Sequence, residues 1–399
     1  MTTTEPRAYP FSQVNRLDME PLLATLRREE PLTRVQLAYG EPTWLATRYE
    51  DAKIVLSDPR FSRAAAADRD EPRSRVYRGN PDTIMHFDPP EHSRLRRLVT
   101  KAFTMRRVEQ LRLRAQEIAD DLVDKILAKG APADVVEDFG LPLPITVICE
   151  LLGVPFDDRA DFRLWSDAFL STTRFTTEEV MNYVGKLRGY IAGLIEQRRQ
   201  KPEDDLLSAL VDARDNEDRL SEEEMLSMAM AILVAGHETT ASQIPNFIYA
   251  LLTNPDQLTI LRDNLDLVPQ AVEELMRFVP LGAAGGIPRY ALEDIELGGV
   301  LVKAGEPVIV NLSSANRDES IYTDPDALDL TRNEPSHIGF GHGPHHCLGA
   351  PLARMELQVA LRTLLARLPG LRFATTAEDI RWKVGVATRA PEHMLLTWD

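Results

Sequence analysis

The stretch from Phe340 to Ala350, which reads FGHGPHHCLGA, constrains the fold and the chemistry of this chain more than any other. It carries Cys347, one of only two cysteines, directly before a segment whose apolar residues recur at helical spacing. The partial positive charge and the unpaired N–H groups of a helix N-terminus favour a thiolate over a thiol. Gly341, Gly343 and Gly349 let the backbone turn sharply or approach a flat, bulky group. The stretch therefore predicts a thiolate that binds the metal of a large planar cofactor.

Two other interpretations of this stretch stay open on local grounds. A lone cysteine is most often a small, buried hydrophobic residue. Cys347 could also join neighbouring histidines in a zinc site, because zinc takes four tetrahedral ligands from Cys, His or carboxylate side chains. The neighbouring histidines are His337, His342, His345 and His346. So many histidines on one short loop converge on a single ion with difficulty, which favours a haem-thiolate site over zinc.

The same stretch resembles the haem-binding loop of cytochrome P-450 monooxygenases. The residues that stand at the signature positions of that family are Phe340, Gly343, His345, Cys347 and Gly349. The resemblance implies that Cys347 is the axial ligand of the iron of haem b, and that Phe340 and Gly341 belong to the cofactor-binding loop. It also implies a mainly α fold, in which a large helical bundle is joined to a smaller β-rich region and the haem lies buried between two central helices.

Patterns along the rest of the chain agree with one domain that spans residues 1–399. Helical spacing dominates residues 88–280 and 348–368. Alternating apolar and polar residues around turns that contain glycine indicate strands, for example in a hairpin at residues 35–48. The β-rich parts are mainly residues 30–60, 283–312 and 372–399. We find no linker or internal repeat that divides the chain.

A helix is predicted to begin at Asp88, a residue type that suits the N-cap position. His92 and Arg96 lie four positions apart and share a face of this helix. They could bind an anion, since a guanidinium group matches a carboxylate, although a solvated basic surface fits the pattern as well. The match of DPPEHSRLRR to the third helix of the family favours haem propionate binding. The resemblance adds Arg289 and His345 to the propionate ligands.

A long helix is predicted from Ser221 to about Leu252, and it begins with a capping box. Polar residues at Ala235–Thr240, AGHETT, interrupt its otherwise apolar character, and buried polar groups need partners. Gly236 is expected to leave the backbone open to a bound group, while the two threonines can bond back to the preceding turn. The segment resembles the oxygen-activating motif of the family. The resemblance implies that Thr239 and Glu238 are catalytic and deliver protons to O2.

Glu274 and Arg277 are three positions apart on a predicted amphipathic helix, close enough to form an ion pair. Such a pair on a surface contributes little. The pair matches the E-x-x-R motif of the family, which is buried and engages a further arginine upstream of the haem loop. The segment Pro325–Leu328 lacks that arginine, so Arg332 is our candidate to replace it.

The composition of the chain limits the kinds of partner that it can bind. The chain has 46 basic and 62 acidic residues, a net charge of −16, and nucleic acids or anionic membranes would repel it. The most apolar run, Met225 to Ala235, is too short to span a bilayer. The N-terminal segment lacks the pattern of a signal peptide. We therefore expect a cytoplasmic monomer with no membrane and no nucleic-acid partner.

Basic residues gather along one part of this acidic chain. They fit an ordinary helix surface, but they could also attract an acidic electron donor and raise its rate of encounter. The resemblance implies that the donor is a ferredoxin, itself reduced by an NAD(P)H-dependent ferredoxin reductase. The cluster comprises Arg94, Arg97, Lys101, Arg106, Arg107, Arg112 and Arg114.

The reaction implied by the resemblance is the insertion of one atom of O2 into a C–H or C=C bond of an apolar small molecule, a secondary metabolite. Small residues at 282–286, at Ala235 and at Gly236 are expected to leave room above the haem. The tip of a C-terminal hairpin, Val386–Thr388, is expected to reach the same pocket. Two rival functions are a zinc hydrolase, which would be colourless, and a haem-binding sensor without turnover. A sensor has no use for the pair of Glu238 and Thr239.

Overall fold

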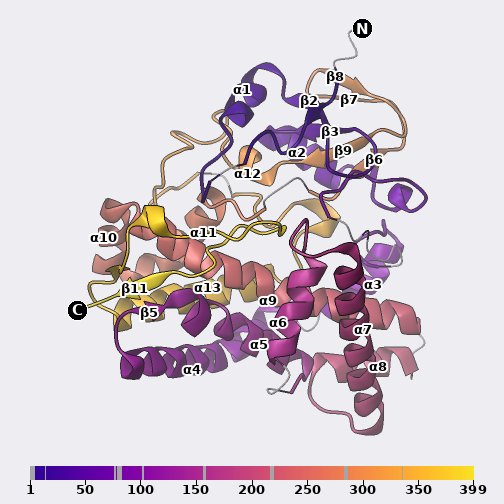
Figure 1. Cartoon of the computed structure of the whole chain (residues 1–399). Helices are drawn as coiled ribbons and strands as arrows, with labels where there is room; N and C mark the ends of the chain where they lie inside the picture. The colour runs from indigo at the N-terminus through magenta and orange to yellow at the C-terminus, as the bar shows by residue number, and fades with distance from the viewer. Residues whose placement is uncertain are drawn as a thin grey trace.

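The computed structural model describes residues 5–13, 15–75, 78, 83–100, 103–155, 159–215, 220–282, 286–334 and 336–399. Helices make up most of this part of the chain, and the largest sheet lies at one end of the molecule with short helices beside it (Figure 1). The α-helices are α1 (Pro21–Glu29), α2 (Tyr49–Ser57), α3 (Glu91–Thr100), α4 (Met105–Lys129), α5 (Pro142–Leu152), α6 (Arg159–Phe169), α7 (Thr177–Gln200), α8 (Leu206–Asp215), α9 (Glu222–Leu252), α10 (Pro255–Asp263), α11 (Val268–Phe278), α12 (Leu312–Ala315) and α13 (Ala350–Arg367).

Short strands form three small sheets. The strands are β1 (Arg7–Ala8), β2 (Leu32–Gln36), β3 (Thr43–Ala46), β4 (Phe61–Ser62), β5 (Ala133–Asp134), β6 (Arg289–Ala291), β7 (Ile295–Leu297), β8 (Val300–Val302), β9 (Pro307–Val310), β10 (Arg372–Phe373) and β11 (Leu395–Thr397). The largest sheet has the order β1-β2-β3-β9-β6-β4, and the others are β10-β11-β5 and β7-β8. Short 3-10 and π turns complete the chain at η1 (Ala64–Ala66), η3 (Val136–Gly140), η5 (Leu265–Leu267), η6 (Gly343–His345) and η7 (Ala377–Asp379).

The strand positions confirm most of the β patterns and correct one. The hairpin predicted at residues 35–48 forms from β2 and β3, with Leu32 opposite Ala46. The prediction that residues 88–280 are helical is wrong at β5, where Ala133 pairs with Leu396 of β11. A strand of two residues has no readable period, so only its distant partner reveals it.

Helix α9 runs through the middle of the helical part, and α5, α7 and α13 pack against it (Figure 1). Its predicted capping box is present: Glu224 N donates to Ser221 Oγ at 3.0 Å, and Ser221 N donates to Glu224 Oε2 at 2.7 Å. Most of its residues are buried on every side, which explains its apolar sequence. No helix within the described ranges combines the length and the apolar character needed to cross a bilayer.

Gly236 of α9 also serves the packing between two helices. A Cβ atom added to Gly236 would lie 2.6 Å from Cδ1 of Ile148 on α5. That is closer than side-chain atoms approach one another, so a larger residue at this position would require Ile148 to shift. Gly236 remains partly accessible, and the expectation that it leaves its backbone open to a bound group stays a prediction.

Glu356 of α13 lies fully inside the helical core, and its side chain is not used by any predicted motif. Neither of its carboxyl oxygens has a hydrogen-bond partner in the structure. Burial raises the pKa of this carboxyl well above its ordinary value, and the nearby Thr240 hydroxyl lowers it only in part. Glu356 is therefore protonated in the folded protein at neutral pH, because an isolated buried carboxylate would cost far more.

We predict that Glu356→Gln raises the unfolding temperature, and raises it more at pH 8 than at pH 5. In the unfolded chain a glutamate loses its proton above about pH 4.3, whereas folding keeps Glu356 protonated because its pKa is raised. Stability is therefore lost as the pH rises from the unfolded toward the folded pKa, by about 1.4 kcal/mol per pH unit. Circular dichroism of thermal unfolding measures the effect. Glu178→Gln, on the surface of α7, is the control, and an unchanged pH dependence in Glu356→Gln would contradict the prediction.

Candidate functional site

The loop that carries Cys347 folds back on itself before α13 begins. The backbone N–H of Cys347 donates to Phe340 O at 2.8 Å, and the short helix η6 lies between them. Gly341 and Gly343 have φ angles of 76° and 70°, which glycine alone adopts readily. A Cβ atom on Gly343 would also lie 2.5 Å from the backbone oxygen of Leu56 on α2. Gly349 has an ordinary φ of −82°, so it does not make a turn that requires glycine. No described atom lies within 4 Å of where its Cβ would be, so the other expectation, close approach of a flat group, stays a prediction.

Cys347 stands just before α13, as predicted, and its side chain remains accessible. Protein nevertheless surrounds the sulfur closely, and this burial raises the pKa of its thiol. The backbone N–H groups of Gly349 and Ala350 and the charge of Arg96 lower the pKa, but by less. The backbone N–H groups at the start of α13 therefore act in the predicted direction, toward the thiolate, although burial opposes them. A bound metal cation deprotonates such a thiol outright.

Arginine and histidine side chains from separate elements meet beside this loop. The rings of His92 on α3 and His345 on η6 lie 4.1 Å apart, and Arg289 of β6 is buried close to them. Burial first, then Arg63, His92 and Arg289, lower the pKa of His345 to about 2. Burial lowers the pKa of Arg289 to about 10 and also lowers that of Arg96, which faces Cys347.

These groups lack a matching set of anions. Within the described ranges, neither Arg96 nor Arg289 has a side-chain hydrogen bond or ion pair, and His345 Nε2 has no partner. Asp88 is the one carboxylate that raises the pKa of both His92 and Arg289. Buried cations without counter-charges are costly. The donor set therefore fits a cofactor that carries two carboxylates and a metal facing Cys347.

Arg63 belongs to this cluster, and the sequence analysis missed it. Arg63 is buried, and its Nε has no hydrogen-bond partner among the described residues. Burial, and to a lesser degree the charge of Arg289, lower the pKa of its guanidinium to about 9. It lies in a polar segment without periodicity, so nothing in the sequence marks it. Asp88 also differs from its predicted role as an N-cap, because α3 begins at Glu91. The Asp88 carboxylate instead accepts the backbone N–H groups of Arg63 at 2.9 Å and Ala64 at 3.3 Å.

The polar segment of α9 divides between two faces. Thr239 Oγ1 donates to Ala235 O at 2.9 Å, which is the predicted back-bond, and the two side chains lie on the accessible side of the helix. Thr240, for which the same bond was expected, is buried next to Glu356 instead. The tip of the C-terminal hairpin reaches α9 one turn further on, where Ser242 Oγ donates to Thr388 Oγ1 at 3.4 Å.

Glu238 is buried and pairs with a residue that the sequence analysis did not identify. Lys383 Nζ lies 3.3 Å from Glu238 Oε1, and the two side chains are only 11% and 4% exposed. Glu238 and Lys383 lie far apart in the sequence, so no local pattern connects them. The pair places the acid of the α9 motif against the C-terminal hairpin.

The family model for cytochrome P450 matches residues 13–369. This chain belongs to the cytochrome P450 family. It is 51% identical, over the full length of both proteins, to the mycinamicin IV hydroxylase/epoxidase of Micromonospora griseorubida. It is equally similar to the nocardicin C N-oxygenase of Nocardia uniformis subsp. tsuyamanensis, again over the full length of both. The crystal structure of HinD with NMFT and NO superposes with a TM-score of 0.97 at 47% identity and covers 99% of this chain and all of HinD.

Membership settles the fold class and the type of enzyme predicted from the sequence. The protein has the cytochrome P450 fold, with a large helical part and a smaller β region. It is a monooxygenase that carries haem iron and acts on a small molecule with O2 and electrons from a redox partner. Membership of a family that carries haem iron agrees with the haem interpretation of the Cys347 stretch, and the assignment of Cys347 as the iron ligand stays a prediction.

The E-x-x-R pair of this cytochrome P450 is buried, as the resemblance implied. Arg277 donates from Nε to Glu274 Oε2 at 2.7 Å and from Nη2 to Oε1 at 2.8 Å. Arg332 Nε donates to the same carboxylate at 3.2 Å, so the predicted substitute arginine is confirmed. Arg277 also donates to the backbone oxygens of Pro325 and Ala327. The network fixes the segment that leads toward the Cys347 loop.

The zinc alternative finds no geometric basis. His337 Nε2 lies 3.2 Å from Glu273 Oε2, and its ring stacks near Phe340 rather than toward Cys347. Arg354 also lies over the Phe340 ring, at 4.5 Å from its centre. No cluster of three or more His, Cys, Asp or Glu side chains with metal-binding geometry occurs among the residues that the structure describes.

Ion pairs neutralise much of the predicted basic cluster. The paired members are Arg94 with Glu224, Arg107 with Asp204, Arg112 with Glu109, and Arg114 with Glu117 and Glu150. Lys101 lies outside the described residues, as do residues 283–285 of the small-residue stretch. Arg97 and Arg106 remain exposed without an ion pair in the described part of the chain.

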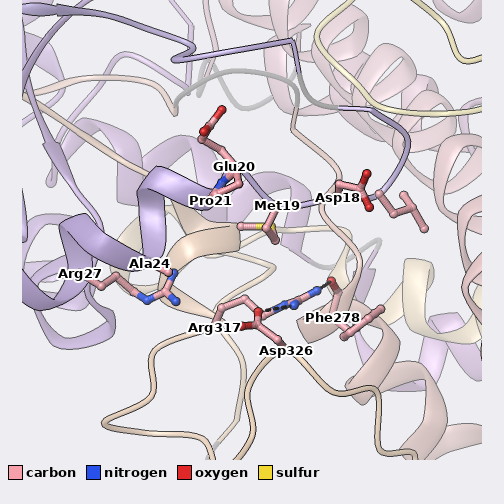
Figure 2. Close-up of a pocket in the computed structure, with 10 residues that line it drawn as sticks. Asp18, Met19, Glu20, Pro21, Ala24, Arg27, Phe278, Arg317 and Asp326 are labelled. Carbon is pink, nitrogen blue, oxygen red and sulfur yellow. Dashed lines mark hydrogen bonds and ion pairs between the residues drawn. The ribbon is translucent and has the colours of Figure 1, made fainter.

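A separate hollow of about 330 Å³ lies between the segment before α1 and the end of α11. Figure 2 shows Arg317 within it, donating to Asp326 at 2.7 Å and to the backbone oxygen of Phe278 at 2.8 Å. Arg27, which also lines it, pairs with Glu319. Both guanidinium groups already have carboxylate partners, and no residue of the Cys347 loop or of the α9 motif lines this hollow. It is therefore not the site of the reaction.

Proposed function

We propose that this cytochrome P450 binds haem b through Cys347 and oxygenates an apolar secondary metabolite with electrons from a ferredoxin. One observation carries the assignment of the site. Buried cations with no matching anions surround His345, directly beside the accessible Cys347. Haem b presents what this arrangement lacks, since it brings two propionates and an iron in one planar molecule.

His92, Arg96, Arg289 and His345 would hold the propionates in this proposal, and Arg63 would add a further positive charge behind them. The propionates would otherwise be buried charges, which cost several kcal/mol each without partners. Phe340 and Gly341 would lie against the porphyrin near Cys347. The ring of Phe340 is already held by Arg354, whose charge also lowers the pKa of the Cys347 thiol.

The thiolate-ligated haem iron would supply O2 activation, because a cysteine thiolate pushes electron density toward the iron and favours O–O cleavage. The full reaction takes the substrate, O2, two electrons and two protons, and gives the oxygenated product and water. The protein must therefore deliver two protons to the bound O2. Thr239 supplies a hydroxyl on the accessible side of α9, and Glu238 is the acid beside it in the sequence.

The resting geometry indicates how Thr239 would act. Its hydroxyl hydrogen is held by Ala235 O, at 2.9 Å, so its oxygen lone pairs face outward and can accept a hydrogen bond from a water or an acid. Rotation of the hydroxyl then passes a proton on. Glu238 would resupply that proton from the opposite face of α9. Proton transfer by positioned groups is typically worth about 10² to 10⁴ in rate.

The substrate class rests on the relatives. The names of two proteins with 51% identity refer to mycinamicin IV and nocardicin C, which they hydroxylate, epoxidise or N-oxygenate. We infer a secondary metabolite for this chain as well, admitted past Ala235 and the hairpin tip at Val386–Thr388. We further propose a cytoplasmic monomer of one domain, reduced by a ferredoxin that meets Arg97 and Arg106.

We predict that Thr239→Ala lowers the yield of product per NADPH by at least about tenfold and diverts electrons to hydrogen peroxide, because the relay hydroxyl is lost. Substrate-induced spin-state spectra should stay as in wild type. Thr239→Ser keeps the hydroxyl and is the matched control, which should retain most of the yield. NADPH, product and peroxide are measured with a surrogate ferredoxin and reductase. Unchanged product per NADPH in Thr239→Ala would refute the relay, and an absence of product from wild type with a broad set of metabolites would favour the sensor.

A further inference from the structure

Glu238 is held by a cation from another part of the fold. Lys383 Nζ approaches its Oε1 at 3.3 Å, while Oε2 has no hydrogen bond within the described part of the chain. Both side chains are nearly inaccessible, at 4% and 11% exposed. A buried ion pair is a poor source of stability, because the desolvation of two charges offsets their attraction. Packing therefore does not explain why a lysine stands at position 383.

Lys383 belongs to a hairpin of residues 381–392. Its backbone N–H donates to Ala390 O at 2.9 Å, and Glu392 N donates to Arg381 O at 2.8 Å, so the two arms are paired. Trp382 next to it packs edge-on against Tyr249 of α9, with ring centres 5.3 Å apart. The base of the hairpin is thus fixed to α9, and Lys383 has a defined position over Glu238.

The tip of the same hairpin contacts two further segments of the fold. The backbone oxygen of Gly385 accepts hydrogen bonds from three successive N–H groups, those of Thr172, Thr173 and Arg174. Thr388 pairs with Gly282 on one side and accepts from Ser242 on the other. A bound substrate that displaces the tip will therefore also displace the arm that carries Lys383.

We propose that Lys383 is a positioning residue for the oxygenation reaction, which holds Glu238 toward the hairpin and so links proton delivery to the hairpin tip that borders the substrate. The inference rests on the proposed role of Glu238 as the proton donor for Thr239. With the pair formed, the Glu238 carboxylate is directed away from the accessible face on which Thr239 lies. A shift of the hairpin lengthens the pair and lets the carboxylate swing toward Thr239. Proton supply then follows substrate occupancy, and reducing equivalents are not spent without a substrate.

The test compares Lys383→Gln with wild type, with and without saturating substrate. We expect substrate-free NADPH oxidation to rise several-fold, because an ionised acid without its cation is no longer held in place. At saturating substrate the pair is already open, so kcat for product should stay within about twofold of wild type. KM and the spectroscopic Kd for substrate should also stay within about twofold, since the side chain does not border the substrate. Lys383→Arg keeps the charge and should keep substrate-free NADPH oxidation near the wild-type rate.

Two further variants separate the inference from the function on which it rests. Lys303→Gln removes a lysine from an exposed ion pair with Asp294 and should behave as wild type. Glu238→Gln tests the proton donor itself and should lower kcat about 100-fold. If Glu238→Gln is fully active, the proposed proton route is wrong and the inference falls with it. If Glu238→Gln is impaired but Lys383→Gln matches wild type in substrate-free NADPH oxidation, only the inference is overturned, and an equal rise in Lys383→Gln and Lys383→Arg overturns it too.

Crystal structures of the wild-type enzyme with and without a bound substrate give a readout that is independent of turnover and of how the variants fold. The inference requires the distance between Lys383 Nζ and Glu238 Oε1 to be longer in the substrate complex. The same contact in both structures would overturn it. A longer distance between Lys383 Nζ and Glu238 Oε1, together with a displacement of the hairpin tip at residues 385–388, would support it.

Discussion

Cys347→Ser is expected to abolish the red-shifted Soret band that a thiolate ligand gives to the ferrous–CO form, and to abolish product formation. A serine hydroxyl keeps its proton far above the pH at which a metal-bound thiol loses one, so it cannot supply the same electron density to the iron. The surroundings of residue 347 strengthen this expectation. Burial already raises the pKa of the thiol there, and it would disfavour an alkoxide even more. A difference spectrum of the reduced, CO-treated protein measures the result.

The second cysteine of the chain is the control. Cys149 is completely buried in α5, far along the sequence from the haem loop. Cys149→Ser places a hydroxyl in the core, at a cost of about 1–3 kcal/mol, but it should leave the spectrum of the ferrous–CO form unchanged. A thiolate-type spectrum retained in Cys347→Ser would rule out Cys347 as the axial ligand. Loss of that spectrum in both variants would show only that each one unfolds.

Glu274→Ala is expected to lower the stability of the folded protein by about 3–5 kcal/mol, because it leaves buried charges without their partner. The carboxylate of Glu274 accepts from both Arg277 and Arg332, and the side chains of these three residues are no more than 8% exposed. Its removal also frees the segment that Arg277 connects to the haem loop through Pro325 and Ala327. Thermal unfolding and the ratio of haem to protein after purification measure the two effects.

Helix α4 offers a matched control for this variant. Glu109 and Arg112 have the same order and the same spacing, and their atoms approach to 2.8 Å, but both side chains lie at the surface. Glu109→Ala should therefore change stability by no more than about 1 kcal/mol. If the two alanine variants are equally stable, then burial does not make the E-x-x-R pair important, and our account of it is wrong.

The features predicted correctly from the sequence are those whose partners lie nearby in the chain or are fixed by a known spacing. The capping box at Ser221 connects residues three positions apart, and the back-bond from Thr239 to Ala235 spans one turn. The position of Cys347 before α13 follows from the helical spacing that comes after it. Arg332 was found because a known network required a third member, which reduced the search to one short segment.

The features that were missed depend on which distant segments pack together. Lys383 meets Glu238 only because the C-terminal hairpin folds over α9, and Arg63 joins the propionate cluster only because β4 pairs with β6. The contact of Gly236 with Ile148 was missed for the same reason, because Ile148 lies on another helix. The thiol of Cys347 shows a related limit. Its pKa depends on how closely the whole fold surrounds the sulfur, which a local helix argument does not include.

The three hydrogen bonds to Gly385 O have a consequence for mutagenesis of the two segments that they join. They tie residues 172–174 to the hairpin tip, and a Cβ atom at Gly385 would lie 2.6 Å from Thr173 Oγ1. Substitutions in the two segments share a backbone contact, so their effects will not add as those of distant sites do. We expect libraries that vary residues 171–175 and 386–388 together to contain folded combinations that stepwise selection of single mutants passes over.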